Sequence, residues 1–372
     1  MTLLYLSSSS IPSKYANSVH VMKMCSGFSR IVDSVILLAK RNKADLVNNE
    51  FLFYDIEREF QINYGPWLNL RGGNLLFSLW SLWRVFRLRP TIVIGRDLVA
   101  STLASIFQWP VILELHSPPQ NLPAIERILL TIAVKKNKLL GIVVISSPLK
   151  LSLVRMYGTT IQNRILVQPD AADVPSNKTS PPLPGTRNFH IGYIGQLSKG
   201  RGIGLIKSLA LEISWAEFHI VGGSDTDLSY WTERCRDIET IHFHGFLPHN
   251  RAATLATKFD LLVAPYQNNV SLYGEGDTSK WMSPLKIFEY MAAHRPILCS
   301  DIDVLHEVLE HNFSCLFCKP EDVDEWIRAI KTIYNNREYG ERLAENAYQN
   351  FLMHYTWQAR ASNIVRYFNV SH

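Results

Sequence analysis

The sequence is 372 residues long, which exceeds one ordinary hydrophobic core and fits two domains. Hydrophobic residues make up 47% of it and charged residues 19%, a balance that excludes a chain disordered throughout. The net charge of +5 suits an acidic ligand or an anionic membrane surface. Because Lys and Arg form no dense cluster on any one element, nucleic acid is not expected as a partner.

Several features of the sequence point to the cytoplasm. No run of about 18 uninterrupted apolar residues is present, so no segment is expected to span a bilayer. Residues 1–6 lead into four serines without a basic segment or a cleavage site of small residues, which argues against a signal peptide. The five cysteines, an odd number, fit a reducing compartment.

Short β-rich apolar runs alternate with helical stretches along the first half of the chain. Runs that are apolar at nearly every position are typical of strands buried on both faces of a parallel sheet. The alternation with helices predicts an α/β domain with a doubly wound, Rossmann-like parallel sheet. The predicted strands are residues 3–6, 34–38, 91–95, 111–115, 141–145 and 164–167.

Residues 169–188 break this alternation with five prolines. Proline neither donates to a β-ladder nor continues a helix, so we interpret this stretch as a linker between an N-terminal domain (1–168) and a C-terminal one (189–350). We expect 351–372 to hold a C-terminal helix that packs back toward the N-terminal domain, and a ligand cleft to form where the domains face each other. In the second half, strands are predicted at 189–194, 217–221, 241–244, 261–264 and 297–300, and helices at 321–335, 338–350 and 356–368.

The segment from Ser283 to Ile297 carries the most information about function. Ser283 is a good N-cap and Pro284 a good first helical residue, so a helix is predicted to begin here. The free amides of its first turn favour a phosphate, and Lys286 adds a positive charge. Glu289 lies on the same helical face and can accept both hydroxyls of a ribose. The alternative is an amphipathic helix with a surface Lys–Glu pair.

This segment, from Leu285 through Glu289-Tyr-Met-Ala to Pro296, resembles the signature of the retaining GT-B glycosyltransferases of family 4, in the variant of bacterial capsule, O-antigen and exopolysaccharide enzymes. The resemblance extends over the whole chain. It implies two Rossmann-like domains, a nucleoside-diphosphate sugar as donor, retention of anomeric configuration, and neither metal nor cofactor.

The sequence departs from the family pattern at one position of this signature. The usual second glutamate would stand at position 281, which is Trp281. Glu275 and Asp277, a few residues upstream, are candidate substitutes for the missing carboxylate.

A glycine-rich stretch from Ile191 to Ile203 opens the C-terminal domain. A strand that runs into such a turn lets the backbone approach a diphosphate closely. The resemblance matches Arg201 to a phosphate-binding Lys, and places Gln196 where the family has Arg, a loss that Lys199 could compensate. The alternative is an ordinary strand–turn–helix with a solvated basic loop. As a dinucleotide fingerprint the glycine spacing is wrong, which argues against a dehydrogenase.

The resemblance assigns further donor contacts to loops that follow strands. The glycines after residue 221 are expected near the diphosphate, and the backbone of residues 246–247 near the nucleobase. The full set of donor-binding candidates is Gly195, Gln196, Lys199, Gly222, Gly223, Phe246, Leu247, Ser283, Pro284 and Leu285.

The N-terminal domain supplies the remaining candidates. Residues 7–18 follow the first predicted strand as a serine-rich loop that precedes a helix. Lys14 and Asn17 in this loop and His20 just after it are candidate acceptor or phosphate contacts, with capping or solvation as the alternative. Arg96 ends another strand and could bind an anionic acceptor group. The resemblance places His116, which ends the strand at 111–115, against the donor sugar.

The predicted activity is transfer of a sugar to a hydroxyl of a growing, lipid-linked surface glycan, with His116, Arg201, Lys286 and Glu289 as catalytic residues. A nucleotide-sugar 2-epimerase of the same fold and a non-catalytic glycan-binding or scaffold paralogue are the alternatives. Residues 74–89 mix aromatic and aliphatic side chains with three arginines, which suits either a helix in the inner-membrane interface or a buried helix whose arginines reach the surface.

Overall fold

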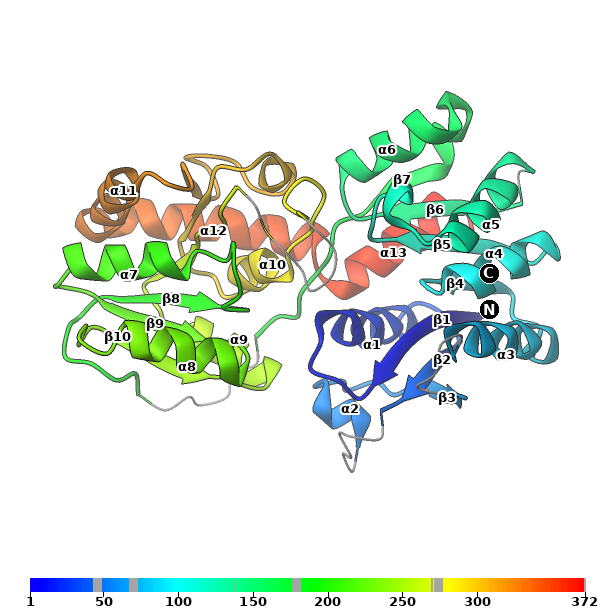
Figure 1. The fold of residues 1–372 in the computed structure, drawn as a ribbon, viewed down its shortest axis with the longest axis horizontal. Helices are drawn as coiled ribbons and strands as arrows, with labels where there is room; N and C mark the ends of the chain where they lie inside the picture. The colour runs from blue at the N-terminus through cyan, green and yellow to red at the C-terminus, as the bar shows by residue number, and fades with distance from the viewer. Residues whose placement is uncertain are drawn as a thin grey trace. The chain divides into compact units, whose positions relative to one another are not determined.

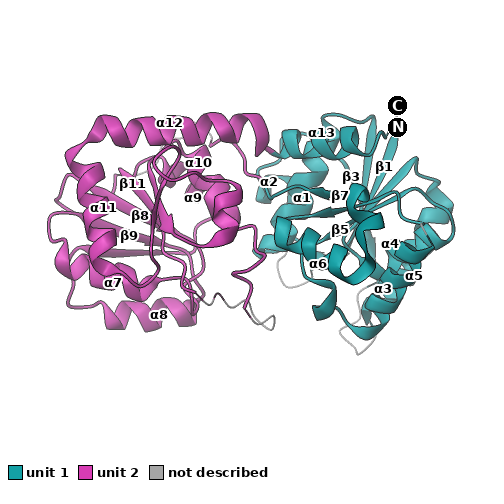
Figure 2. Cartoon of the chain, turned by 90° about the horizontal axis from the view of Figure 1, so that it is seen from above, with its two compact units in different colours: residues 1–170, 357–372 teal, residues 171–356 magenta. Residues whose placement is uncertain are grey.

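The computed structural model describes residues 1–42, 49–66, 73–136, 138–175, 182–268, 270 and 277–370. The chain forms two compact units (Figure 2): unit 1 is Met1–Asp170 with Trp357–His372, and unit 2 is Ala171–Thr356. Within unit 2, Ala172 and Thr356 form an isolated parallel bridge, so the two stretches that lead out of this unit lie side by side.

Unit 1 is built on a seven-stranded sheet in the order β3-β2-β1-β4-β5-β6-β7, all pairs of which are parallel (Figure 1). The order reverses between β1 and β4, the position where ligands bind in doubly wound sheets. Every residue of the central strands β4, β5 and β6 is buried, as their apolar sequences predict. The strands are β1 (Thr2–Ile11), β2 (Ser34–Arg41), β3 (Gln61–Gly65), β4 (Ile92–Gly95), β5 (Val111–Leu115), β6 (Gly141–Val144) and β7 (Ile165–Val167).

Helices connect these strands, and the last helix of the chain joins them. α13 packs against α1, where Gly27 is needed because a Cβ there would stand 2.6 Å from the carbonyl oxygen of Trp357. α4 contacts both α3 and α5. The helices of unit 1 are α1 (Ala16–Ser29), α2 (Glu50–Phe53), α3 (Gly73–Leu88), α4 (Leu98–Ile106), α5 (Ala124–Lys135), α6 (Ser147–Tyr157) and α13 (Trp357–Tyr367).

Two predictions for this unit were wrong in detail. The serines that we expected in a loop belong to β1, which continues to Ile11 through a register shift against β2 between Leu6 and Ser10. Strand β3 was not predicted, because its side chains are half-buried or exposed at the edge of the sheet and form no continuous apolar run.

Unit 2 holds a six-stranded parallel sheet in the order β10-β9-β8-β11-β12-β13. Here the order reverses between β8 and β11. β13 was not predicted as a strand, although its residues lie in an apolar run that the sequence marks as β-prone. The strands are β8 (His190–Ile194), β9 (Glu217–Val221), β10 (Ile241–Gly245), β11 (Leu261–Ala264), β12 (Ile297–Ser300) and β13 (Leu316–Cys318).

Two hydrophobic clusters of unit 2 lie among its strands and helices. One includes residues of α7 and α11, with Trp326 fully buried, and the other includes residues of α9, α10 and α12. The helices are α7 (Ile203–Glu212), α8 (Asp225–Arg234), α9 (His249–Ala256), α10 (Leu285–Ala292), α11 (Val323–Asn335) and α12 (Arg337–His354).

Candidate active site

The loops that follow β8, β9 and β10 pack backbone against backbone at one edge of the unit 2 sheet. The amide of Gly195 donates to the carbonyl of Val221 at 2.9 Å, and the amide of Gly222 donates to that of Gly245 at 2.7 Å. Gly222 has φ +110°, and a Cβ on it would collide with the carbonyl of Gly195. Only glycine allows this approach, and Gly195, Gly222 and Gly245 form a half-buried backbone surface at the carboxyl ends of the strands.

Arg201 lies next to this surface, in the turn that precedes α7. Its guanidinium stands 5.7 Å from the centre of the Tyr266 ring. The Nε atom is buried and has no hydrogen-bond partner among the described residues. Gly202, which follows, has φ +83° and packs against the carbonyl of Pro265, so the turn is held in place by glycine geometry.

Lys286 places a second cation at the same edge. The side chain is buried, with Nζ 3.9 Å from the centre of the Tyr193 ring and 4.9 Å from that of Tyr266. A Cβ on Gly195 would stand 2.8 Å from this Nζ, so the ammonium lies directly against the glycine loop. Burial, followed by the charge of Arg201, holds the pKa of Lys286 well below its usual value. Two neighbouring cations without a carboxylate in ion-pair contact among the described residues form a site that an anion would stabilise.

α10 begins one residue later than predicted. Pro284 is the N-cap and Leu285 the first helical residue, and no side chain caps the helix. Lys286 and Glu289 do not form the surface pair of the alternative interpretation, because Lys286 points into the tyrosines. Glu289 instead lies 3.4 Å from Nδ1 of His249, whose Nε2 lies 3.9 Å from Asp173.

His249 is a site residue that the sequence analysis missed. It is the first residue of α9 and directly follows the loop assigned to the nucleobase, so its position in the chain was the available signal. In the same loop Phe246 is exposed and Leu247 is half-buried. The other donor candidates are half-buried at Gly223, Ser283, Pro284 and Leu285 and exposed at Gln196 and Lys199.

Of the two candidate substitutes for the second glutamate, the structure describes only Asp277. Asp277 accepts bonds through Oδ1 from the amides of Val270 and Ser279 and from the Ser279 hydroxyl, and these bonds outweigh burial and lower its pKa. This oxygen therefore already holds its own loop together. Glu275 lies outside the described residues.

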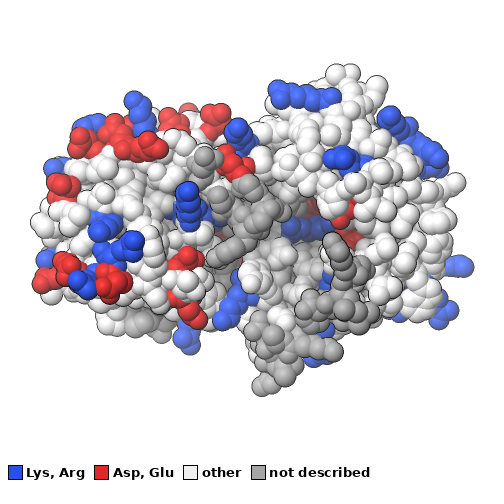
Figure 3. Space-filling model, in the orientation of Figure 1, with Lys and Arg blue, Asp and Glu red and all other residues white. Residues whose placement is uncertain are grey.

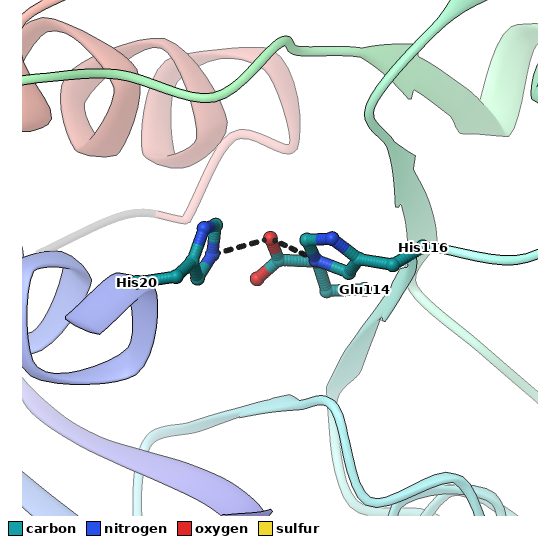
Figure 4. A group of neighbouring side chains, drawn as sticks. All are labelled: His20, Glu114 and His116. Atoms are coloured by element: carbon teal, nitrogen blue, oxygen red, sulfur yellow. Dashed lines mark hydrogen bonds and ion pairs between the residues drawn. The ribbon is translucent and has the colours of Figure 1, made fainter. Parts of the chain in front are cut away.

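The second group of site residues lies in unit 1 around Glu114, at the end of β5 (Figure 4). Its Oε1 atom lies 2.9 Å from Nε2 of His20, 3.0 Å from Nε2 of His116 and 2.7 Å from Nη2 of Arg360. Its Oε2 atom accepts a bond from the hydroxyl of Tyr5 at 2.8 Å. β1, α1, β5 and α13 each contribute a residue to this cluster.

The charges of the cluster compensate one another. Burial alone would raise the pKa of Glu114, but Arg360 and His20 outweigh it and hold this pKa well below its usual range. His20 also contacts Asp170, with 2.8 Å between Nδ1 and Oδ1. Burial and then Arg96 lower the pKa of His116 to about 4, so this imidazole is neutral near pH 7.

His20, Glu114 and His116 are residue types that bind metals, and their ligand atoms lie within 4.8 Å of one another. Both histidine Nε2 atoms, however, approach the same carboxylate oxygen. A cation would need that oxygen as a ligand, and the guanidinium of Arg360 already occupies it. The contacts are those of a charge-compensated hydrogen-bond cluster, and we assign no metal to it.

The acceptor candidates of unit 1 fall into three environments. Lys14 and Asn17 are exposed. His20 is 2% exposed and turns both ring nitrogens toward carboxylates, which leaves neither for an acceptor. Arg96 follows β4 beside the His116 cluster, and its Nη1 atom is buried without a hydrogen-bond partner among the described residues.

Two units with parallel sheets, each with polar side chains at an edge of its sheet, define a GT-B fold. Residues 176–350, which include Arg201, Lys286 and Glu289, match the sequence model of the family Glycosyl transferases group 1. No curated protein sequence matches the chain significantly.

Solved structures share the fold over the whole chain. The Anabaena protein Alr3699/HepE in complex with UDP is 15% identical, with a TM-score of 0.74 and coverage of 100% of both chains. A glycosyltransferase from Rickettsia africae is 13% identical, with a TM-score of 0.75 over 99% of this chain and 98% of that one. The lipopolysaccharide outer core galactosyltransferase WaaB is 12% identical, with a TM-score of 0.66 over 98% of this chain and 99% of that one. The family match and the fold together support a GT-B glycosyltransferase.

Proposed function

We propose that this protein transfers a sugar from a nucleoside-diphosphate sugar to a hydroxyl of a growing surface glycan, with retention of anomeric configuration. The observation that carries the proposal is the pair of cations, half-buried Arg201 and buried Lys286, against the glycine loops of unit 2. Charge develops on the diphosphate as the bond to the sugar breaks. Cations fixed in place before the reaction stabilise that charge without reorganisation, and this role requires no metal.

We assign the remaining donor contacts to residues of unit 2. Glu289 accepts bonds from the ribose hydroxyls, and the backbone near Phe246 and Leu247 contacts the base. Two of the solved structures similar to this chain contain UDP and UDP-glucose, which supports a nucleotide sugar as donor. In unit 1, His116 contacts the donor sugar and Arg96 binds an anionic group of the acceptor.

The acceptor is proposed to be lipid-linked and the protein to bind the cytoplasmic face of the inner membrane. Within the described part of the chain, no helix is both long and apolar enough to cross a membrane. The support comes from α3, on which Leu79 and Trp83 are 49% and 52% exposed, and from α5, on which Ile125 and Ile128 are 60% and 59% exposed. Basic side chains lie over the α5 and α6 side of unit 1 in Figure 3, and an anionic surface would attract them.

Thermal stability in the presence of UDP, GDP, ADP, CMP and NAD tests the donor site. We expect one nucleoside diphosphate to raise the melting temperature of the protein, and Arg201→Ala to abolish the shift. Arg251→Ala, which removes an exposed arginine of the same unit, is the matched control. Stabilisation by none of the diphosphates, or by NAD alone, would refute the proposal.

Turnover separates the proposal from its alternatives. A transferase releases nucleoside diphosphate when donor and acceptor are both present. A 2-epimerase converts the donor sugar without any acceptor. Binding of the donor without turnover on any acceptor would favour the non-catalytic paralogue, for which Trp281 and Gln196 are the supporting observations.

A further inference from the structure

We propose that the C-terminal helix α13 is part of the catalytic apparatus, with Arg360 as a positioning residue that acts through Glu114 to set the tautomer and the charge of His116. This inference rests on the role proposed above for His116. It assigns a function to a helix that lies beyond residues 176–350 and whose sequence carries none of the recognised motifs.

The first observation is how α13 packs against α1. Gly27 of α1 lets the backbone of Trp357 approach, and a Cβ at that position would also lie 3.5 Å from Cβ of Ala361. The Trp357 ring stands 5.3 Å from the ring of His20 at an interplanar angle of 89°. α13 is therefore packed against the same helix that presents His20 to Glu114.

The second observation is the set of bonds that Arg360 makes. The side chain is fully buried, with Nη2 2.7 Å from Oε1 of Glu114 and Nε donating to the carbonyl of Pro169 at 2.8 Å. Nη2 also lies 3.3 Å from the carbonyl of Gln168. A guanidinium held at several points by backbone and carboxylate cannot leave its position without exposing unpaired buried groups.

The consequence for His116 follows from the chemistry of the carboxylate. An ionised carboxylate only accepts hydrogen bonds, so Nε2 of His116, 3.0 Å from Glu114, must carry the ring proton. The neutral ring then keeps a lone pair on Nδ1. Among the described residues none bonds to Nδ1, which is therefore available to accept a bond from a substrate hydroxyl.

Arg360 is required for this state because it compensates the buried charge of Glu114. Besides Arg360, the groups that face the cluster are Tyr5, His20, Cys25, Arg96 and Asp170. If Arg360 is replaced by a neutral side chain, Glu114 either attracts a proton onto His116 or takes one itself and donates it to Nε2. The first outcome charges the imidazole, and the second reverses its tautomer.

The test is nitrogen NMR of the full chain labelled with ¹⁵N-histidine, with His116→Asn used for assignment. In the wild-type protein we expect His116 to remain neutral and protonated at Nε2 down to about pH 5. In Arg360→Met we expect its titration to move upward by about one to three pH units, or its tautomer to change. Arg360→Lys should restore the wild-type state in part, and Arg366→Met, an exposed arginine of the same helix, should leave it unchanged.

A spectrum of His116 that is the same in Arg360→Met as in the wild type would overturn the inference. If Arg360→Met does not fold, Glu114→Gln provides the test. Loss of the carboxylate should produce a mixture of the two tautomers of His116. Unchanged ¹⁵N shifts in that variant would also overturn it. These readouts need no turnover, so they test the effect of Arg360 on His116 separately from the proposed function, which the thermal-stability measurements with nucleotides test.

Discussion

Arg360 and Glu114 stand 246 positions apart in the chain, yet Nη2 of one lies 2.7 Å from Oε1 of the other. The two side chains are 0% and 1% exposed. Because a buried charge that loses its partner is left without compensation, this contact makes the stability of unit 1 depend on its last helix.

The Arg360–Glu114 pair is expected to show strong energetic coupling. Arg360→Met should lower the free energy of unfolding by about 3–5 kcal/mol, because Glu114 then loses the cation that compensates its buried charge. Arg360→Met combined with Glu114→Gln should be more stable than Arg360→Met alone, since the uncompensated charge is gone. Urea denaturation of the two single variants and the double variant measures the coupling. A double variant whose loss equals the sum of the single losses would contradict it.

Lys286→Met should raise the stability of the ligand-free protein while it weakens nucleoside diphosphate binding. Burial and Arg201 lower the pKa of Lys286, which means that its charged form destabilises the folded state at neutral pH. Met keeps most of the apolar contact with the tyrosines and removes that charge. We expect a higher melting temperature without ligand and an affinity lower by about 10-fold or more, from loss of one charge-assisted contact. Lower ligand-free stability with unchanged affinity would show that the lysine is structural.

Gly222→Ala is expected to destabilise unit 2 and to disrupt the loop after β9, which is proposed to lie near the diphosphate. Its φ of +110° and the nearby carbonyl of Gly195 leave no room for a Cβ. Urea denaturation should show a loss of about 1–3 kcal/mol. Gly204→Ala is the matched control, because Gly204 lies in α7 and its added Cβ would meet only the Trp231 ring, at 3.8 Å. That change should be neutral or stabilise by up to about 1 kcal/mol.

A row of histidines crosses the unit 2 sheet around His219 of β9. The side chain is buried, with Nε2 2.9 Å from Nδ1 of His190 and Nδ1 3.1 Å from Nε2 of His244. Its ring also stacks on that of His242, with 5.1 Å between centroids. Burial and then the neighbouring histidines His244, His242 and His190 lower the pKa of His219 to about 3.

This row should make unit 2 sensitive to acid. The pKa of His219 is lower in the folded state than the ordinary value near 6.5, so the unfolded chain binds the proton first. The contribution of His219 to the stability of unit 2 is complete above about pH 6.5. It is lost as the pH falls toward 3, by about 1.4 kcal/mol per pH unit for one histidine. Urea midpoints at pH 7, 6 and 5 should show a weaker pH dependence for His219→Gln than for the exposed control His354→Gln. An equal dependence of the urea midpoint on pH in the two variants would show that His219 is not the source of the acid sensitivity.

Exposed apolar residues of α3 should drive binding to anionic membranes. Trp83→Glu, combined with Leu79→Glu, should abolish cosedimentation with vesicles that contain anionic phospholipid, because both side chains are about half exposed. Leu211→Glu provides the control, since Leu211 is 61% exposed on unit 2. Equal binding by both variants would remove α3 as the contact.

Local patterns in the sequence determined much of this protein. Runs that are apolar at nearly every position, such as Val111–Leu115, predicted buried parallel strands, and the structure confirms two parallel-sheet α/β units. The start of α10 was predicted to within one residue by Ser283 and Pro284. These features can be predicted from the sequence because burial on both faces of a sheet and the preference of proline for helix starts depend on neighbouring residues.

The tertiary structure alone decided which distant side chains meet. Lys286 turns toward Tyr193 and Tyr266, and not toward Glu289 three positions away, because the glycine loop of β8 closes over it. Arg360 reaches Glu114 only because α13 is seated against α1. The sequence carries no local signal for such contacts: the energy of a buried charge depends on its partners in space, which the packing of separate elements brings together.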